Sequence, residues 1–159
     1  MGKTRYFTGP AGPPSSLGSH ALQTSEIQAQ HPVQYCPMQG LHLTADLTDC
    51  QCDSAWLTDA ARLGAACVQA VHATGLQSVA QLFHTFPSTA QGPGGVTATV
   101  LLAESHLCVH TWPEQRGATL DVYVCNFGGD HSAKAHALMD ALLALFAAKQ
   151  VVRHRIHRG

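Results

Sequence analysis

Three short apolar runs follow one another between residues 96 and 125, with short connections between them. Short runs rich in β-branched residues are typical of strands. They predict strands over Val96–Ala103, Ser105–Thr111 and Thr119–Cys125, the second ended by Trp112-Pro113 because proline cannot donate to an inner ladder. Consecutive strands with short connections favour antiparallel pairing, so this block restricts the fold to a mainly antiparallel sheet.

Polar residues occupy the junction of the first two strands. Glu104, Ser105 and His106 stand between the apolar runs, and His110 follows four residues after His106. Such groups are costly in a strand unless they are satisfied or used. Periodicity alone favours a polar edge of the sheet as their explanation.

The rest of the chain supplies further strands and two helices. Gly40–Leu47 alternates apolar and polar residues, and Leu76–Phe86 and Val151–Arg158 also have strand patterns. Helices are predicted over Ser54–Thr74, with Ser54 as its N-cap, and from Asp130 or Ser132 to about Lys149. The order β-α-β-β-β-β-α-β predicts an α+β fold, a two-layer α/β sandwich with a mainly antiparallel sheet and both helices on one face.

Composition excludes some partners. Charged residues make up 12% of the 159 residues, hydrophobic residues 45%, and the net charge is -1. This charge gives no basic footprint for nucleic acid, and no apolar stretch is long enough to cross a bilayer. The start of the chain has no apolar signal region, so we expect a cytoplasmic protein. The low charge fits a chain that buries one face against a second copy.

Neither the cysteines nor the histidines predict a metal site. Cys50-Gln51-Cys52 has the wrong spacing for a zinc knuckle, and no second pair answers it at zinc-finger spacing. We therefore expect no metal. Residues 1–37 are rich in Pro, Gly, Ser and Gln, without apolar period, and predict a flexible N-terminal extension.

One set of motifs resembles a known family. Glu104-Ser105-His106, then His110-Thr111-Trp112-Pro113-Glu114, then Asp121 and Cys125, resembles the prokaryotic S-adenosylmethionine decarboxylase proenzyme family. The resemblance runs from about Gly40 to the C-terminus and is densest from Val96 to Cys125. It implies a decarboxylase domain over residues 38–159, a two-layer sandwich of the predicted kind, and a homodimer of cleaved protomers.

The resemblance also implies a self-made cofactor. The bond between Glu104 and Ser105 would cut itself, and Ser105 would become a covalent pyruvoyl group, the electron sink that decarboxylation needs. His110 would assist as a base, Thr97 would support processing with its hydroxyl, and Cys125 would protonate the substrate's α-carbon. Strict alternation puts Ser105 and His110 on opposite faces of a strand, so we expect a bulge or a sharp bend near Ser105.

The substrate remains open at this point. Phe86 matches the family aromatic that stacks on the adenine, and Glu114 the acid that contacts the substrate, but the loop Pro87–Gly95 is longer than in short members of the family. S-adenosylmethionine, decarboxylated to the aminopropyl donor of spermidine synthesis, is the leading substrate. Arginine or ornithine is the first alternative, and a non-catalytic homologue acting as a regulatory or partner subunit is the second.

Overall fold

The computed structural model describes residues 38–159, so the N-terminal extension predicted over residues 1–37 lies outside the described residues. The strands are β1 (Gly40–Cys50), β2 (Ser78–Thr85), β3 (Val96–Leu102), β4 (Ser105–Trp112), β5 (Gly117–Cys125) and β6 (Ala148–Arg158). The helices are α1 (Ala55–Thr58), α2 (Ala60–Ala73) and α3 (Ser132–Phe146), with a short 3-10 turn, η1, over Pro113–Gln115.

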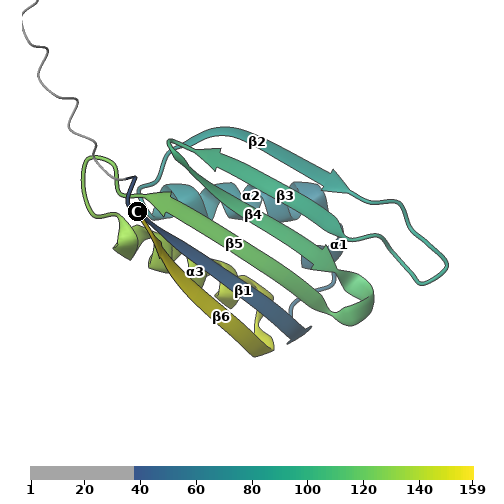
Figure 1. Cartoon of the computed structure of the whole chain (residues 1–159). Helices are drawn as coiled ribbons and strands as arrows, with labels where there is room; N and C mark the ends of the chain where they lie inside the picture. Colours follow the sequence, from purple (N-terminus) through teal and green to yellow (C-terminus); the bar gives the residue numbers. More distant parts are fainter. Residues whose placement is uncertain (1–37) are drawn as a thin grey trace, which may run out of the picture. The chain divides into compact units, whose positions relative to one another are not determined.

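The six strands form one antiparallel sheet in the order β2-β3-β4-β5-β1-β6. In Figure 1 the helices lie behind the sheet, and the opposite face of the sheet is turned to the viewer. The predicted α+β class, with its mainly antiparallel sheet, is confirmed. We call the uncovered side of the sheet the outer face.

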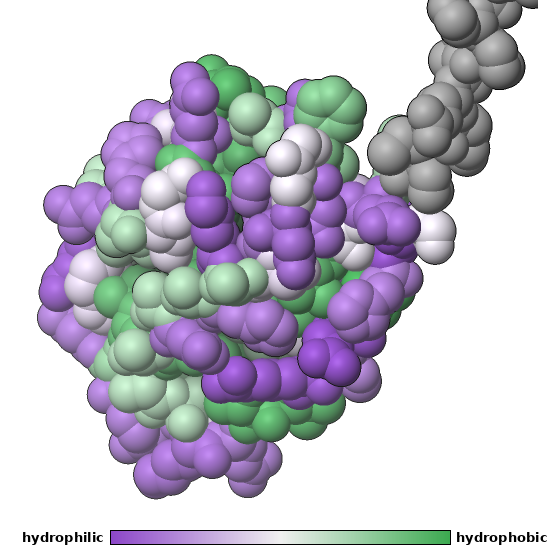
Figure 2. All heavy atoms as spheres, turned by 90° about the vertical axis from the view of Figure 1, so that its left-hand side faces the viewer, coloured by the Kyte–Doolittle hydropathy of each residue, from purple (hydrophilic) through white to green (hydrophobic). Residues whose placement is uncertain are grey.

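The core lies between the sheet and the helices. Alternate residues of each inner strand point into it, and α2 and α3 each add an apolar stripe. The stripe on α2 consists of Leu63, Cys67 and Val71, and Leu138 and Leu142 belong to the stripe on α3; all five are fully buried. Much of the surface seen in Figure 2 is hydrophilic, with smaller hydrophobic patches between. Within residues 38–159, no helix combines the length and apolar character needed to cross a membrane.

The prediction of a single helix over Ser54–Thr74 is wrong, because Asp59 interrupts it and separates α1 from α2. Asp59 has extended dihedrals, and its carboxylate accepts hydrogen bonds from the backbone N–H groups of Ala61 and Arg62. These are the N-cap contacts of a new helix, α2. The predicted cap, Ser54, precedes the four-residue α1 and makes no side-chain cap bond.

Three further boundaries that differ from the prediction are the end of α3, the start of β6 and the end of β2. α3 ends at Phe146 rather than near Lys149, because Ala147 takes a left-handed conformation with φ 46° and turns the chain into β6. β6 therefore begins at Ala148, three residues before the predicted start at Val151. β2 spans Ser78–Thr85 and so stops one residue short of Phe86.

Candidate active site

The predicted site residues lie at two ends of the central strands. Thr97 of β3, His110 of β4 and Cys125 of β5 alternate with buried neighbours and so face outward. Their outward neighbours on β1, β3, β4 and β5 are also mostly polar. The outer face is therefore polar, while the covered face carries the core.

Glu104 lies in the turn between β3 and β4, at one end of the sheet, and Ser105 begins β4 there, in the same alternation as the buried residues Leu107 and Val109. Leu102 pairs with Ser105, so the turn contains only two residues, and Glu104 has a left-handed φ of 60°. The backbone N–H of Cys125 donates a hydrogen bond of 2.9 Å to Ser105 Oγ. The peptide bond predicted to be cut thus lies in a tight turn, and the Ser105 hydroxyl is held beside the backbone of Cys125.

Cys125 is half-exposed, and its thiol has a hydrogen-bond partner. Its Sγ lies 3.6 Å from the carbonyl oxygen of Gln39, which can accept the thiol proton. Cys50 and Cys67 differ from it, because burial raises the pKa of Cys50 to about 11 and that of Cys67 to about 12. A cavity of about 160 Å³ opens beside the turn and is lined by residues that include Cys125 and Lys134.

His110 and Thr97 lie at the other end of the sheet, on its outer face. They are opposite each other on β4 and β3, and Thr97 Oγ1 is 2.9 Å from His110 Nδ1. When Nδ1 carries the proton and donates it to the hydroxyl, Nε2 keeps a free lone pair. Thr97 can therefore hold the exposed imidazole in the form that a base requires.

Ser105 and His110 do not meet within one chain. Five residues of β4 separate them, which corresponds to ~17 Å at ~3.4 Å per residue. A tight turn does precede Ser105, but the pairing of β4 with β3 runs without a shift from Ser105 to His110. Ser105 and His110 thus stay on opposite faces, as the alternation predicts, and the bulge is not found in β4. The sharp bend beside Ser105 is the turn at Glu104, which does not bring the two side chains together.

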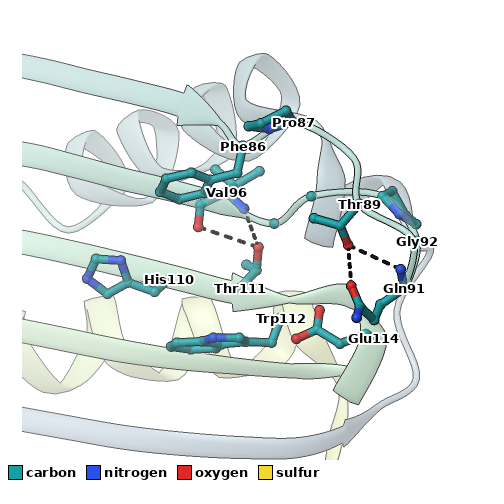
Figure 3. A pocket seen from close by; sticks show the side chains of 13 residues that line it. Phe86, Pro87, Thr89, Gln91, Gly92, Val96, His110, Thr111, Trp112 and Glu114 are labelled. Atoms are coloured by element: carbon teal, nitrogen blue, oxygen red, sulfur yellow. Dashed lines mark hydrogen bonds between the residues drawn. The ribbon is translucent and has the colours of Figure 1, made fainter.

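A cavity of about 530 Å³ adjoins His110 at its end of the sheet. Phe86 and Glu114, both predicted to bind substrate, line it together with His110. The ring of Trp112 also lines it, and Figure 3 shows Phe86 and Trp112 on opposite sides of His110. Thr97 and His110 thus belong to the same end as the two predicted substrate-binding residues, whereas Ser105 and Cys125 belong to the other.

The outer face also holds a network that the sequence did not predict. His42 Nε2 lies 2.9 Å from both carboxylate oxygens of Asp121, and His106 Nε2 lies 3.2 Å from one of them. Among residues 38–159, these three side chains bring donor atoms of metal-ligand type within 4.8 Å of one another. The odd–even alternation of β1, β4 and β5 could have placed them together.

Tyr123 borders both this network and Cys125. Its ring packs against His42 and His106, with ring centroids 5.9 and 5.6 Å away, and Arg158 lies 5.1 Å above it. Removal from water, followed by the proximity of Cys125, raises the pKa of Tyr123. The phenol therefore stays protonated and can act as a donor beside the thiol.

Comparison with known proteins gives one consistent result. The S-adenosylmethionine decarboxylase family matches residues 41–159. The S-adenosylmethionine decarboxylase proenzyme of Aquifex aeolicus is 36% identical over 120 residues, which are 76% of this chain and 81% of that protein. The proenzyme of Caldanaerobacter subterraneus is 40% identical over 92 residues, 58% of this chain and 66% of that protein.

A solved structure agrees with the sequence comparisons. The crystal structure of the adenosylmethionine decarboxylase from Aquifex aeolicus is similar to this fold with a TM-score of 0.66 and 32% sequence identity. The similarity covers 78% of this chain and 93% of that one. The matched residues contain the turn at Glu104, the Thr97–His110 pair and Cys125. On these grounds, the chain belongs to the S-adenosylmethionine decarboxylase family.

Proposed function

We propose that this chain is a proenzyme that cuts itself between Glu104 and Ser105 and then decarboxylates S-adenosylmethionine. The observation that carries the proposal is the two-residue turn at Glu104, in which Ser105 Oγ is held by the backbone of Cys125. The family supports it, because its members compared here are named S-adenosylmethionine decarboxylase proenzymes.

In the cleavage step, Ser105 Oγ attacks the carbonyl carbon of Glu104 and converts the amide into an ester. Elimination then frees Glu104 as a new carboxyl end, and the residue left at position 105 takes up water and loses ammonia. A left-handed φ costs a non-glycine residue ~1–2 kcal/mol, so cutting the turn at Glu104 also releases strain.

The residues at this end fit the group that cleavage would make. A pyruvoyl group at position 105 supplies a carbonyl that accepts the electrons left behind by carbon dioxide. The group would start β4 and lie next to Cys125, whose backbone N–H contacts Ser105 Oγ and whose thiol lines the same cavity. Cys125 then delivers its proton to the substrate's α-carbon, a task for which a thiol is a better acid than a serine hydroxyl.

The separation of ~17 Å between Ser105 and His110 supports an active site that is completed by a second copy of the chain. A two-fold axis through the middle of the outer face exchanges the two ends of β4. Ser105 and Cys125 of one protomer then lie over the end of its partner that carries the equivalents of Thr97 and His110. We therefore assign the base of the elimination to the His110 supplied by the second copy.

The outer face is built for such a contact. Its centre is polar, while exposed apolar side chains flank it on both sides: Leu82 and Leu101 on β2 and β3, and Val152 and Ile156 on β6. Exposed apolar groups around a polar centre are typical of surfaces that become buried on association. They support a homodimer in which each active site takes residues from both chains.

The substrate is tested directly with carboxyl-labelled compounds. The purified chain should release labelled carbon dioxide from S-adenosylmethionine and none from arginine or ornithine. Release from arginine or ornithine alone would replace the proposed substrate. No release from any of them, by a chain that has remained uncut, would favour a non-catalytic role.

The shared site is tested by mixing two inactive chains. We expect neither Ser105→Ala nor His110→Ala to cleave when expressed alone. When the two are co-expressed with tags of different mass, the His110→Ala chain should be cut, because it keeps Ser105 and receives a histidine from its partner. A mixture that stays uncut would place both residues in one chain's site. His72→Ala, exposed on α2, is the control and should cleave normally.

A further inference from the structure

One wall of the cavity at the His110 end is formed by residues that do not belong to the family motifs. His110 and Trp112 come from β4, and Phe86 directly follows β2. The far wall is the loop over residues 87–95, which contributes Thr89, Gln91 and Pro93. In Figure 3, Gln91 and Thr89 lie at the end opposite His110, next to Glu114. This loop is the segment predicted from the sequence to be unusually long.

The base of the loop is fixed against the sheet. A Cβ on Gly94 would lie 2.0 Å from the carbonyl oxygen of Phe86, and one on Gly95 would lie 2.0 Å from that of Thr111. Only glycine allows so close an approach. The N–H of Phe86 also donates to the carbonyl of Gly95 at 2.9 Å. The loop therefore leaves the sheet in one direction, over the cavity.

The tip of the loop fixes the side chain of Gln91. Thr89 and Gly92 exchange two backbone hydrogen bonds, of 2.8 and 3.1 Å. Thr89 Oγ1 accepts from the backbone N–H of Gln91 and donates to its side-chain Oε1 at 2.8 Å. Because Thr89 Oγ1 holds Oε1, the NH₂ group of Gln91 is the part of the amide that is left without a partner in the loop and can donate into the cavity.

Glu114 supplies the complementary acceptor. Its carboxylate lies beside Gln91 in Figure 3, and no ion pair or side-chain hydrogen bond engages it within residues 38–159. A carboxylate accepts from two hydroxyl groups at once, while an amide NH₂ donates to a hydroxyl oxygen. A ligand with two neighbouring hydroxyl groups matches this arrangement, because each hydroxyl can donate to Glu114 and accept from Gln91.

We propose that Gln91 is a substrate-binding residue that, with Glu114, reads the ribose hydroxyls of a nucleoside substrate. This inference rests on the proposed function and deepens it. The side chain of arginine or ornithine carries only hydrogen-bond donors. It could pair with Glu114 but would leave the NH₂ group of Gln91 without an acceptor. The long loop thus selects a nucleoside over a basic amino acid.

The test measures binding rather than turnover. The processed, full-length protein is titrated calorimetrically with 5′-methylthioadenosine, which has no amino acid part to react, and with its 2′-deoxy and 3′-deoxy forms. Gln91→Leu should weaken binding of the ribonucleoside about 3–10-fold, the loss of one neutral hydrogen bond. Thr89→Val, which frees the Gln91 side chain, should weaken it less. Ser88→Ala, in the same loop but outside the cavity lining, should change nothing.

The deoxy forms decide whether Gln91 reads a hydroxyl. For one of the two deoxynucleosides, Gln91→Leu should not weaken binding any further, because the hydroxyl that the Gln91 amide would contact is already absent. The proposal is overturned if Gln91→Leu binds the ribonucleoside like the unchanged protein, if all three nucleosides lose equally, or if the unchanged protein binds none. If the unchanged protein decarboxylates S-adenosylmethionine and Gln91→Leu binds the ribonucleoside as tightly as it does, this inference is wrong and the proposed function stands. If nucleoside binding depends on Gln91 but no decarboxylation occurs, the inference stands and the proposed function is wrong.

Discussion

The backbone of Glu104 is the residue-scale feature most closely tied to the chemistry. A left-handed φ of 60° is uncommon for a residue with a Cβ, and here it falls on the peptide proposed to break. The local sequence does not predict this left-handed conformation, because the turn contains no glycine, the usual residue at such a position. The strain is therefore visible only in the structure.

Replacing Glu104 by glycine should relieve that strain. In the uncut Ser105→Ala chain, we expect Glu104→Gly to raise the free energy of unfolding by up to ~1 kcal/mol, as measured by urea denaturation. Ala103→Gly, the neighbouring turn position without a positive φ, should lower it. If both substitutions destabilise the chain to the same extent, the turn does not hold Glu104 in the left-handed region.

The hydroxyl of Thr97 should matter through His110. Thr97→Val removes the 2.9 Å contact with Nδ1 but keeps the shape of the side chain. We expect self-cleavage to slow about 2–10-fold, the effect of one neutral hydrogen bond on the barrier. Thr99→Val, two residues along the same face and in contact with Cys108 rather than His110, is the matched control. Equal cleavage rates for the two variants, followed by mass spectrometry over time, would remove Thr97 from the mechanism.

At the scale of elements, Thr111 joins three segments from inside the core. Its Oγ1 donates to the carbonyl of Leu57 in α1 and accepts from the N–H of Val96 in β3, both at 2.7 Å. The side chain is only 6% exposed. It thus anchors α1 and the start of β3 to β4, beneath the cavity that His110 adjoins.

Thr111→Val should therefore destabilise the chain without disturbing its shape. It leaves a buried carbonyl and a buried N–H unpaired, which typically costs ~1–3 kcal/mol for each such group. We expect a fall of ~2–4 kcal/mol in the free energy of unfolding, measured by urea denaturation of the uncut chain. Thr99→Val, on the outer face, should change it little. A small effect of Thr111→Val would mean that other groups or water replace the lost partners.

Several elements could be predicted from local pattern, and others depend on distant contacts. The strands from Val96 to Cys125 follow from their short apolar runs, and the structure has strands at each of them. The break at Asp59 could not be predicted, because an aspartate early in a helical stretch fits a first turn as well as a cap. Alternation placed Ser105 and His110 on opposite faces of β4, and the unshifted pairing with β3 agrees.

At the scale of the whole molecule, the outer face is proposed to join two copies. Ile156 of β6 lies at its edge, directly opposite His42, and is 51% exposed. Ile156→Glu should place a charge in the contact, weaken the dimer and slow self-cleavage together. Light scattering after size exclusion gives the mass, and the fraction cut gives the processing. Ala65→Glu, exposed on the helical layer, should affect neither.

Full cleavage by a monomeric Ile156→Glu chain would separate processing from assembly. The shared site would then be wrong, and His110 would have to reach Ser105 by a change within one chain. Such a change would have to break the continuous pairing of β3 with β4.

The most direct test is the intact mass of the purified, denatured protein. The account predicts two fragments, residues 1–104 and a second fragment beginning with a pyruvoyl group at position 105, and a single chain for Ser105→Ala. A single uncut mass for the unaltered protein, identical in behaviour to Ser105→Ala after prolonged incubation, would contradict the self-processing on which the proposed catalysis depends.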